Sequence, residues 1–175
     1  TSPASIRRLF PLPSSLMLRR FGFGRFAARL KRGETVRDVV AQQRNRQDSL
    51  SVRDVVIPPS LSVAGTLEKL TDERSSGALL VKLPGHKISG IVTQHDALRW
   101  MIGAPSGAEH CVDVSRIMSK AVVYVPADTP KAECIHVMKE RGIQHLPVLD
   151  DQKLCGLVSL FDLVSDLDDV SESQT

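Results

Sequence analysis

One motif occurs twice in this sequence, and the repeat constrains the fold more than any other feature. Gly90–Asp96 reads GIVTQHD and Gly156–Asp162 reads GLVSLFD, so glycine, two apolar residues, a hydroxyl residue and an aspartate keep the same spacing. The similarity extends over residues 55–98 and 122–164, with an offset of 66 or 67 positions. An internal repeat of this length indicates two copies of one folding unit.

Each copy predicts the order β-α-β-β-α. A short strand ends near a proline, and Ser62 or Thr129 then stands where the N-cap of an amphipathic helix belongs. An apolar strand, a turn and the GIV or GLV strand form a hairpin, and a second helix begins at Thr93 or Ser159. One copy alone would leave an apolar sheet face exposed. We therefore expect an α/β fold in which two β-α-β-β-α repeats pack as a pseudo-twofold pair, with an extended basic N-terminal arm.

The charge is distributed unevenly along the chain. Residues 1–50 carry eleven Arg or Lys and three acidic residues, whereas the remainder is acidic, and the first 33 residues contain no Asp or Glu. A segment rich in Arg and Ser and free of acids is typical of a mitochondrial transit peptide, which predicts a mitochondrial location. The alternatives for the arm are contact with RNA, an acidic protein groove or an anionic membrane surface, or a leftover of targeting without a further role. Its predicted RNA or partner contacts are Arg7, Arg8, Arg19, Arg20, Phe21, Phe23, Arg25 and Phe26.

Residues 34–50 predict a short helix and a polar link. TVRDVV at 35–40 is echoed by SVRDVV at 51–56, and a hydroxyl residue followed three positions later by Asp favours a repeated helix start. The expected organisation is an arm at 1–33, a short helix and linker at 34–50, repeat 1 at 51–110, repeat 2 at 111–168 and an acidic tail at 169–175.

Residues 51–168 resemble a tandem pair of CBS domains, often called a Bateman module. The resemblance rests on DVSRIMSK at 113–120, RGIQHLPVLD at 141–150 and the two glycine-to-aspartate motifs. Together with the basic start, the chain is also similar to small mitochondrial CBS-pair proteins.

The resemblance implies a module that binds an adenosine-containing ligand: AMP, ADP, ATP or S-adenosylmethionine. The motif aspartate would accept hydrogen bonds from both ribose hydroxyls, the Ser or Thr would lie near the phosphates, and adenine would lie between apolar backbone segments. The implied ligand-binding residues are Thr93, Asp96, Ser159, Asp162, Ala78, Leu79, His145 and Pro147. From the residues alone, both motifs also fit the capping box [ST]-x-x-[DE], which needs no ligand.

The sequence shows no arrangement typical of an enzyme. We find no nucleophile, base and orienting group at the usual spacings, no P-loop and no zinc-binding pattern among the histidines and the three scattered cysteines. We therefore predict a non-enzymatic protein without a metal. It is either a regulatory module that acts on a mitochondrial partner, with a homodimer as one assembly, or a structural accessory subunit. The accessory subunit would belong to the mitochondrial ribosome or a respiratory complex, with the arm as its anchor and nucleotide binding vestigial.

Overall fold

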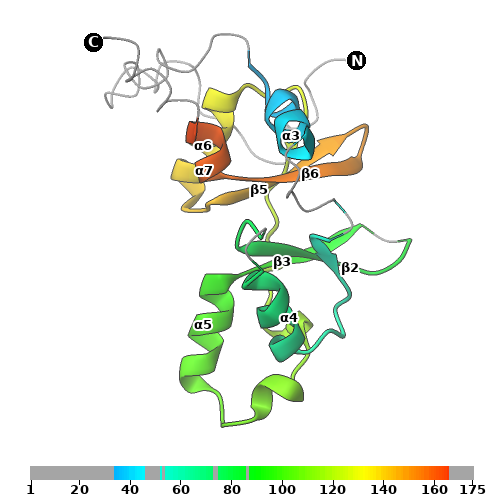
Figure 1. The fold of residues 1–175 in the computed structure, drawn as a ribbon, viewed down its shortest axis with the longest axis vertical. Coiled ribbons are helices and arrows are strands. Elements are labelled where there is room, and N and C mark those ends of the chain that lie inside the picture. Colours follow the sequence, from blue (N-terminus) through cyan, green and yellow to red (C-terminus); the bar gives the residue numbers. More distant parts are fainter. Residues whose placement is uncertain (1–33, 46–51, 53, 73–74, 86, 166–175) are drawn as a thin grey trace.

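The computed structural model describes residues 34–45, 52, 54–72, 75–85 and 87–165. Its elements confirm the predicted order β-α-β-β-α in two copies (Figure 1). Repeat 1 comprises β1 (Val56–Ile57), α4 (Val63–Leu70), β2 (Ala78–Lys82), β3 (Ile88–Thr93) and α5 (Gln94–Gly103), and repeat 2 comprises β4 (Val125–Pro126), α6 (Lys131–Arg141), β5 (His145–Asp150), β6 (Lys153–Ser159) and α7 (Leu160–Val164). Along the chain, helix α3 (Val36–Asn45) precedes repeat 1. The 3-10 helices η2 (Ala108–His110) and η3 (Val114–Arg116) follow α5 and precede β4.

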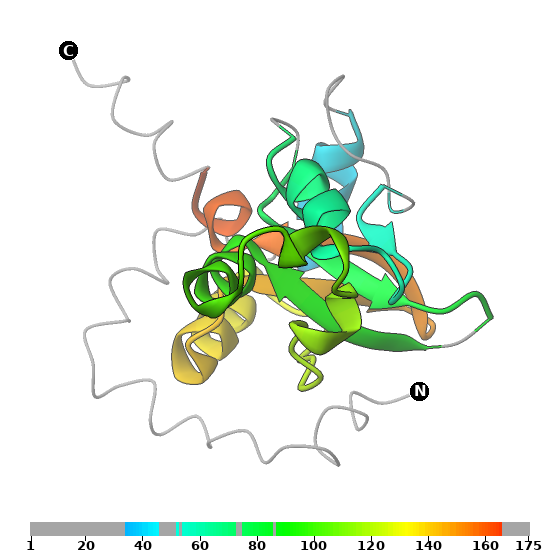
Figure 2. The same ribbon diagram turned by 90° about the horizontal axis from the view of Figure 1, so that it is seen from below.

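Each repeat contains a three-stranded sheet, ordered β1-β2-β3 in repeat 1 and β4-β5-β6 in repeat 2. The first pair in each sheet is parallel and the second is an antiparallel hairpin. The two sheets face each other in the middle of the molecule, and the helices cover their outer sides (Figures 1 and 2). Val55, Ala78 and Leu80 of repeat 1 share a buried cluster with Leu157 of repeat 2. The expected pairing of two repeats through their apolar sheet faces is therefore confirmed.

The sequence explains the bounds of the first helix in repeat 2. Cys134, Ile135 and Met138 recur at helical spacing on α6, and all three are buried in the core of that repeat. Gly142 ends the helix with a φ of 62°, in the left-handed region that favours glycine. This helix thus covers the outer face of the repeat 2 sheet.

The two predicted N-caps have different outcomes. Ser62 caps α4 as expected, because its hydroxyl oxygen accepts the Gly65 N–H at 3.1 Å. The prediction for Thr129 is wrong: the N-cap of α6 is Pro130, and Thr129 is buried one residue earlier. Thr129 instead uses its carbonyl oxygen to accept the Val36 N–H at 2.8 Å. The backbone of residue 129 therefore takes part in a contact with α3, and α6 begins one position later than predicted.

The segments that precede the two repeats are exchanged between them. Just as Val36 donates to Thr129 of repeat 2, Val114 donates its N–H to the Leu61 carbonyl oxygen of repeat 1 at 2.8 Å. The chain at 34–40 therefore packs on repeat 2, and the chain at 112–119 packs on repeat 1. The structural counterpart of TVRDVV at 35–40 is therefore DVSRIM at 113–118. The expected second helix start at 51–56 is wrong, because its described residues lie in turns and in β1.

Two of the predicted segments fall outside the described residues. These are the arm at 1–33, with its eight predicted contact residues, and the tail at 169–175. Among the helices that the structure describes, none combines the length and the apolar character needed to cross a membrane.

Candidate functional site

In repeat 1, the motif hydroxyl and carboxylate form a complete capping box at the start of α5. The Thr93 backbone N–H and hydroxyl donate to Asp96 Oδ2 at 2.9 and 2.7 Å, and the Asp96 N–H donates back to Thr93 Oγ1 at 3.2 Å. Both residues are half-buried. The end of β3 and the start of α5 are thus fixed to each other.

Repeat 2 reproduces this geometry at the junction of β6 and α7. The Ser159 backbone N–H and hydroxyl donate to Asp162 Oδ2 at 2.7 and 2.6 Å, and the Asp162 N–H donates to Ser159 Oγ at 3.2 Å. Phe161 stands between them in the sequence, and the residue is 73% exposed. The ring therefore points away from the core.

The two boxes use only one oxygen of each carboxylate. Asp96 and Asp162 each accept two hydrogen bonds at Oδ2, and within the described part of the chain neither Oδ1 takes part in a hydrogen bond. An ionised carboxylate has about four lone-pair sites, so each retains unused acceptor capacity. The capping function is present in the structure, and it leaves room for a second function at the same side chain.

The other four predicted ligand residues lie at the starts of β2 and β5. Ala78 pairs with Thr93 and His145 pairs with Ser159, so equivalent positions in the two sheets lie beside the two boxes. The side chains of Ala78 and Leu79 are fully buried, and Leu79 lies in the core of repeat 1. Pro147 is buried as well. The structure thus brings Ala78 and His145 next to the boxes, whereas Leu79 has no exposed surface.

His145 also joins the two repeats. Its Nε2 lies 2.6 Å from the Ser76 carbonyl oxygen, just before β2 of repeat 1. A carbonyl oxygen can only accept, so Nε2 carries the proton in this contact. The Ser76 hydroxyl is buried and has no hydrogen-bond partner among the described residues. The starts of β2 and β5 are therefore tied together at a polar position between the sheets.

The glycine of each motif allows a close approach, a function that sequence reasoning missed. A Cβ at Gly156 would lie 2.7 Å from Val40 Cγ2 on α3, and a Cβ at Gly90 would lie 2.9 Å from the Ser119 carbonyl oxygen and closer still to the Met118 sulfur. Carbon atoms that are not bonded prefer about 3.5–4.0 Å. Only glycine therefore lets the exchanged segments pack directly on β3 and β6. The occurrence of glycine at the same point in both motifs was the available signal.

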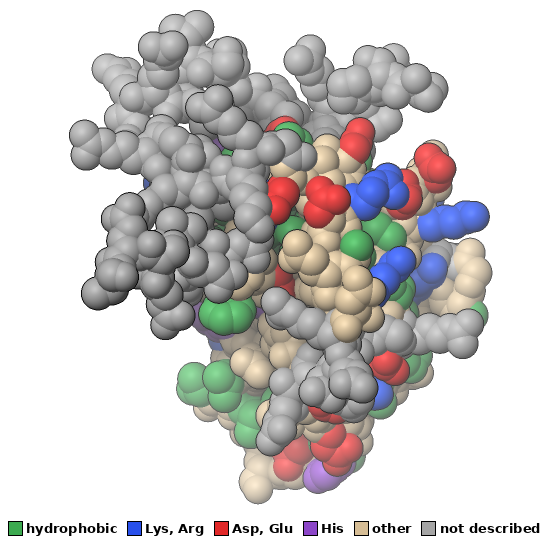
Figure 3. All heavy atoms as spheres, turned by 45° about the horizontal axis from the view of Figure 1, so that its top comes forward, with side chains coloured by type: hydrophobic (Ala, Val, Ile, Leu, Met, Phe, Trp, Pro, Cys, Tyr) green, Lys and Arg blue, Asp and Glu red, His purple; other side chains and the backbone are tan. Residues whose placement is uncertain are grey.

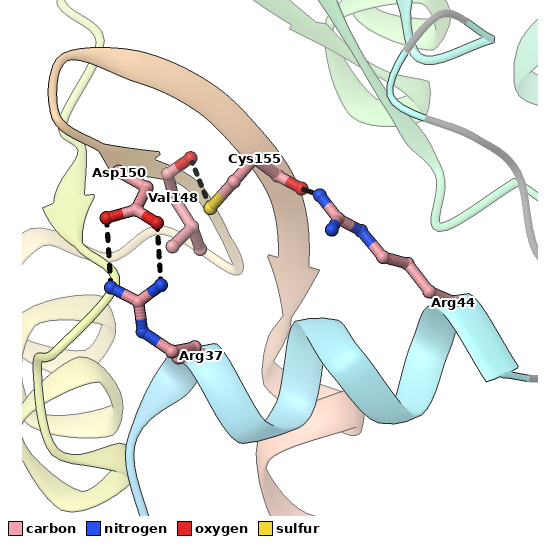
Figure 4. A network of polar contacts seen from close by, with 5 residues as sticks. All are labelled: Arg37, Arg44, Val148, Asp150 and Cys155. Carbon is pink, nitrogen blue, oxygen red and sulfur yellow. Dashed lines mark hydrogen bonds and ion pairs between the residues drawn. The ribbon is translucent and has the colours of Figure 1, made fainter.

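Helix α3 is fixed to repeat 2 by polar contacts as well as by packing (Figure 4). The Arg37 guanidinium donates to both carboxylate oxygens of Asp150, at 2.6 and 2.9 Å, and this hydrogen bonding holds the pKa of Asp150 below its usual value. Arg44 donates to the Cys155 carbonyl oxygen at 2.7 Å. Lys131, which is 2% exposed, pairs with Glu34 at 3.1 Å. Figure 3 shows Lys or Arg side chains next to Asp or Glu side chains on the part of the surface that comes forward there.

The comparison with family models decides the family. The CBS domain model matches residues 48–103 and again residues 114–169. The chain belongs to the CBS-domain family. Both matches begin after α3, so the helix that completes the core of repeat 2 lies outside the family-model match. Within the described residues, no group of His, Cys, Asp and Glu side chains could hold a metal ion.

Relatives and solved structures agree with this family. An uncharacterised 17.7 kDa protein from Acidianus ambivalens is 30% identical over 120 residues, covering 68% of this chain and 70% of the relative. The mitochondrial CBS-domain protein CBSX3 of Arabidopsis thaliana is 31% identical over 100 residues, covering 55% of this chain and 48% of the relative. The chain thus spans about half the length of that relative. A protein with CBS domains from Burkholderia ambifaria has a TM-score of 0.66 at 30% identity, covering 81% of this chain and 98% of that one.

Two more distant structures contain adenosine compounds. CBSX2 in complex with AMP has a TM-score of 0.60 at 22% identity, covering 80% of this chain and all of that chain. The CBS domain pair of protein MJ0100, in complex with methylthioadenosine and S-adenosylmethionine, has a TM-score of 0.59 at 21% identity, covering 78% of this chain and 96% of that chain. At these identities the likeness shows a shared fold.

Proposed function

We propose that this protein is a regulatory CBS pair that binds an adenosine-containing ligand at one or both capping boxes. The observation that carries the proposal is the unused Oδ1 of Asp96 and of Asp162, beside the starts of β2 and β5. A carboxylate whose first oxygen is fixed by a helix cap is held in one orientation, so its second oxygen is available without a further loss of side-chain entropy. CBS domains generally regulate rather than catalyse, and adenosine compounds bound to the two distant structures support this ligand class.

Replacement of the motif aspartates by asparagine distinguishes their role in the helix cap from a role in ligand binding. In Asp162→Asn, the amide oxygen can still accept the cap hydrogen bonds, but the NH2 group at the other position cannot accept from a ribose hydroxyl. We expect about 10-fold or greater loss of AMP affinity, since a hydrogen bond to a charged group contributes about 1.5–3 kcal/mol. Asp96→Asn reports on repeat 1 in the same way. Isothermal titration calorimetry of the full chain with AMP, ADP, ATP and S-adenosylmethionine measures the effect.

A thermal unfolding series gives an independent measure of binding. A ligand at 100 times its Kd adds about 2.7 kcal/mol to the unfolding free energy, which corresponds to a Tm increase of roughly 5–10 °C for a chain of this size. Ser62→Ala is the matched control, because it removes a helix cap outside the motifs and should leave the ligand-induced shift unchanged. Absence of a shift with all four ligands would contradict the proposal and leave the motifs as helix caps.

We place the protein and its partner in mitochondria within this proposal. Support comes from the acid-free basic segment at 1–33 and from the mitochondrial relative CBSX3. Imaging of the tagged full-length protein against a mitochondrial marker tests the location. The accessory-subunit alternative predicts RNA or complex association through the arm. Co-sedimentation of the wild type with mitochondrial ribosomes, lost when Arg19 and Arg20 are replaced by Glu, would favour that alternative.

A homodimer through α5 is part of the same proposal. Three large apolar side chains on this helix are exposed: Leu98 is 60%, Met101 46% and Ile102 90% exposed. In Figure 3 hydrophobic side chains are visible at the lower left, the side on which α5 lies in Figure 1. Burial of these side chains against a second copy would stabilise a dimer. Ile102→Glu should then convert a dimer to a monomer in sedimentation velocity, and a dimer that persists would place the interface elsewhere.

A further inference from the structure

Helix α3 shares one buried core with the residues on both sides of the repeat 2 box. Val36, Val39 and Val40 of α3 lie in the same cluster as Val158 and Leu163. Val158 directly precedes Ser159, and Leu163 directly follows Asp162. Since protein cores are close-packed, movement of α3 changes the packing at both ends of the box.

The polar contacts of α3 act on the strand that leads to the box. Arg44 and Gln43 donate to the carbonyl oxygens of Cys155 and Leu157, at 2.7 and 3.4 Å. Both carbonyls belong to β6, which is the last strand in its sheet. The outer edge of β6 therefore relies on α3 for hydrogen bonds, as the edge of β3 relies on Ser119, which exchanges two hydrogen bonds with Ile91 at 2.8 and 2.9 Å.

We propose that α3 is a positioning element for the repeat 2 box and couples occupancy of that box to the N-terminal segment. Docked α3 holds β6 and α7 in the arrangement in which Ser159 and Asp162 meet. If α3 docking raises the affinity of the box for a ligand, the ligand must strengthen α3 docking by the same factor. The ligand part of this inference rests on the proposed function, whereas the positioning part concerns the protein alone. Residues 1–33 lie N-terminal to α3 in the chain, so a change in the docking of α3 would be transmitted to the arm.

Repeat 1 provides an internal comparison. There the core around the Thr93 box contains Val114, with Met118 packed against it, and α3 contributes none of its described members. Loosening α3 should therefore affect the second box and spare the first. Loosening the segment at 112–119 should do the reverse.

The first experiment needs no ligand. Hydrogen exchange of the full chain is followed by mass spectrometry in the wild type, Val40→Ala and the matched variant Met118→Ala. We expect Val40→Ala to speed exchange of the amides at 159–163 about 10-fold, with those at 93–97 unchanged, and Met118→Ala to give the opposite pattern. Arg37→Ala, which leaves the core intact, is the second variant and should act in the same direction as Val40→Ala. Faster exchange confined to 36–45 in both α3 variants would overturn the positioning claim.

The second experiment adds AMP, with binding measured by calorimetry on the same samples. Saturating AMP should slow exchange at 36–45 in the wild type. Val40→Ala should weaken AMP binding, by at most the factor by which AMP strengthens α3 docking. If AMP binds through Asp162 and exchange at 36–45 does not change, the coupling is refuted and the proposed function stands. If AMP does not bind, the ligand part of the coupling fails with the proposed function, and the exchange data without ligand still decide whether α3 positions the box.

Discussion

Replacement of Gly156 by alanine tests the packing of α3 on β6 most directly. The new Cβ would lie 2.7 Å from Val40 Cγ2 and 2.9 Å from Val40 Cγ1, about 1 Å inside the preferred carbon–carbon separation. Overpacking of this kind costs about 1–3 kcal/mol, and removal of glycine from a strand returns about 0.5–1 kcal/mol. We expect Gly156→Ala to lower the unfolding free energy by about 1–2 kcal/mol and the Tm by roughly 2–8 °C.

A double-mutant cycle identifies the cause of that loss. Val40→Ala removes both methyl groups that the new Cβ would meet, and by itself it should cost about 2 kcal/mol through lost burial and the cavity. In that background the nearest remaining Val40 atom is Cβ at 3.4 Å, an ordinary contact. Gly156→Ala should then be neutral or slightly stabilising, which gives a coupling free energy of about 1–2 kcal/mol.

The measurement is urea unfolding of the full chain followed by circular dichroism, for the wild type, both single variants and the double variant. Gly103→Ala is the control, because a Cβ there meets no atom within 4 Å and should be neutral or stabilising. Additivity of the two substitutions within about 0.5 kcal/mol would refute the reasoning. It would mean that α3 does not lie against Gly156 in solution.

Two further outcomes follow from the thiols and from the ion pair on α3. A maleimide reagent at neutral pH should label exposed Cys111 rapidly and leave Cys134 unmodified in the native chain. The reason is that burial raises the pKa of the Cys134 thiol to about 12. Peptide mapping that found Cys134 labelled first would contradict the packing of α6. The pKa of Asp150 is lowered in the folded state by its hydrogen bonds from Arg37, so the pair stabilises docking fully above the unfolded pKa and loses this effect as pH falls through the folded pKa. Exchange at 36–45, corrected for intrinsic rates, should therefore be faster at pH 3 than at neutral pH, and Arg37→Ala should remove much of the difference.

The sequence predicted most of the fold because the repeat supplied each signal twice. The hydroxyl-to-aspartate spacing placed the starts of α5 and α7 at Thr93 and Ser159, as the structure has them. The apolar runs GALLV at 77–81 and HLPVL at 145–149 predicted the central strands β2 and β5. Hairpins and helix caps could thus be predicted from the sequence, since they are formed by residues a few positions apart.

The errors arose where distant segments meet. Thr129 was a sound cap by composition, but its backbone is engaged by Val36, more than ninety positions earlier. The exchange of the two leading segments could not be predicted from local patterns. TVRDVV at 35–40 is nearly identical to SVRDVV at 51–56, which is not its structural counterpart. It shares only the spacing of apolar residues with DVSRIM at 113–118, which is. For the site, the sequence predicted the boxes, and the structure added the unused oxygen at Asp96 and Asp162. Ligand binding by the predicted site residues stays a prediction.

The exchange of leading segments also sets the order in which the chain can fold. Arg37 and Asp150 are 113 positions apart, and β6 follows Asp150. At a synthesis rate of about 5–20 residues per second, α3 leaves the ribosome roughly 5–25 s before its docking surface exists. Repeat 1, completed by its own following segment, can form first. The valines of α3 can be buried only after β6 has been synthesised, and closing this long loop should be the slow step of folding.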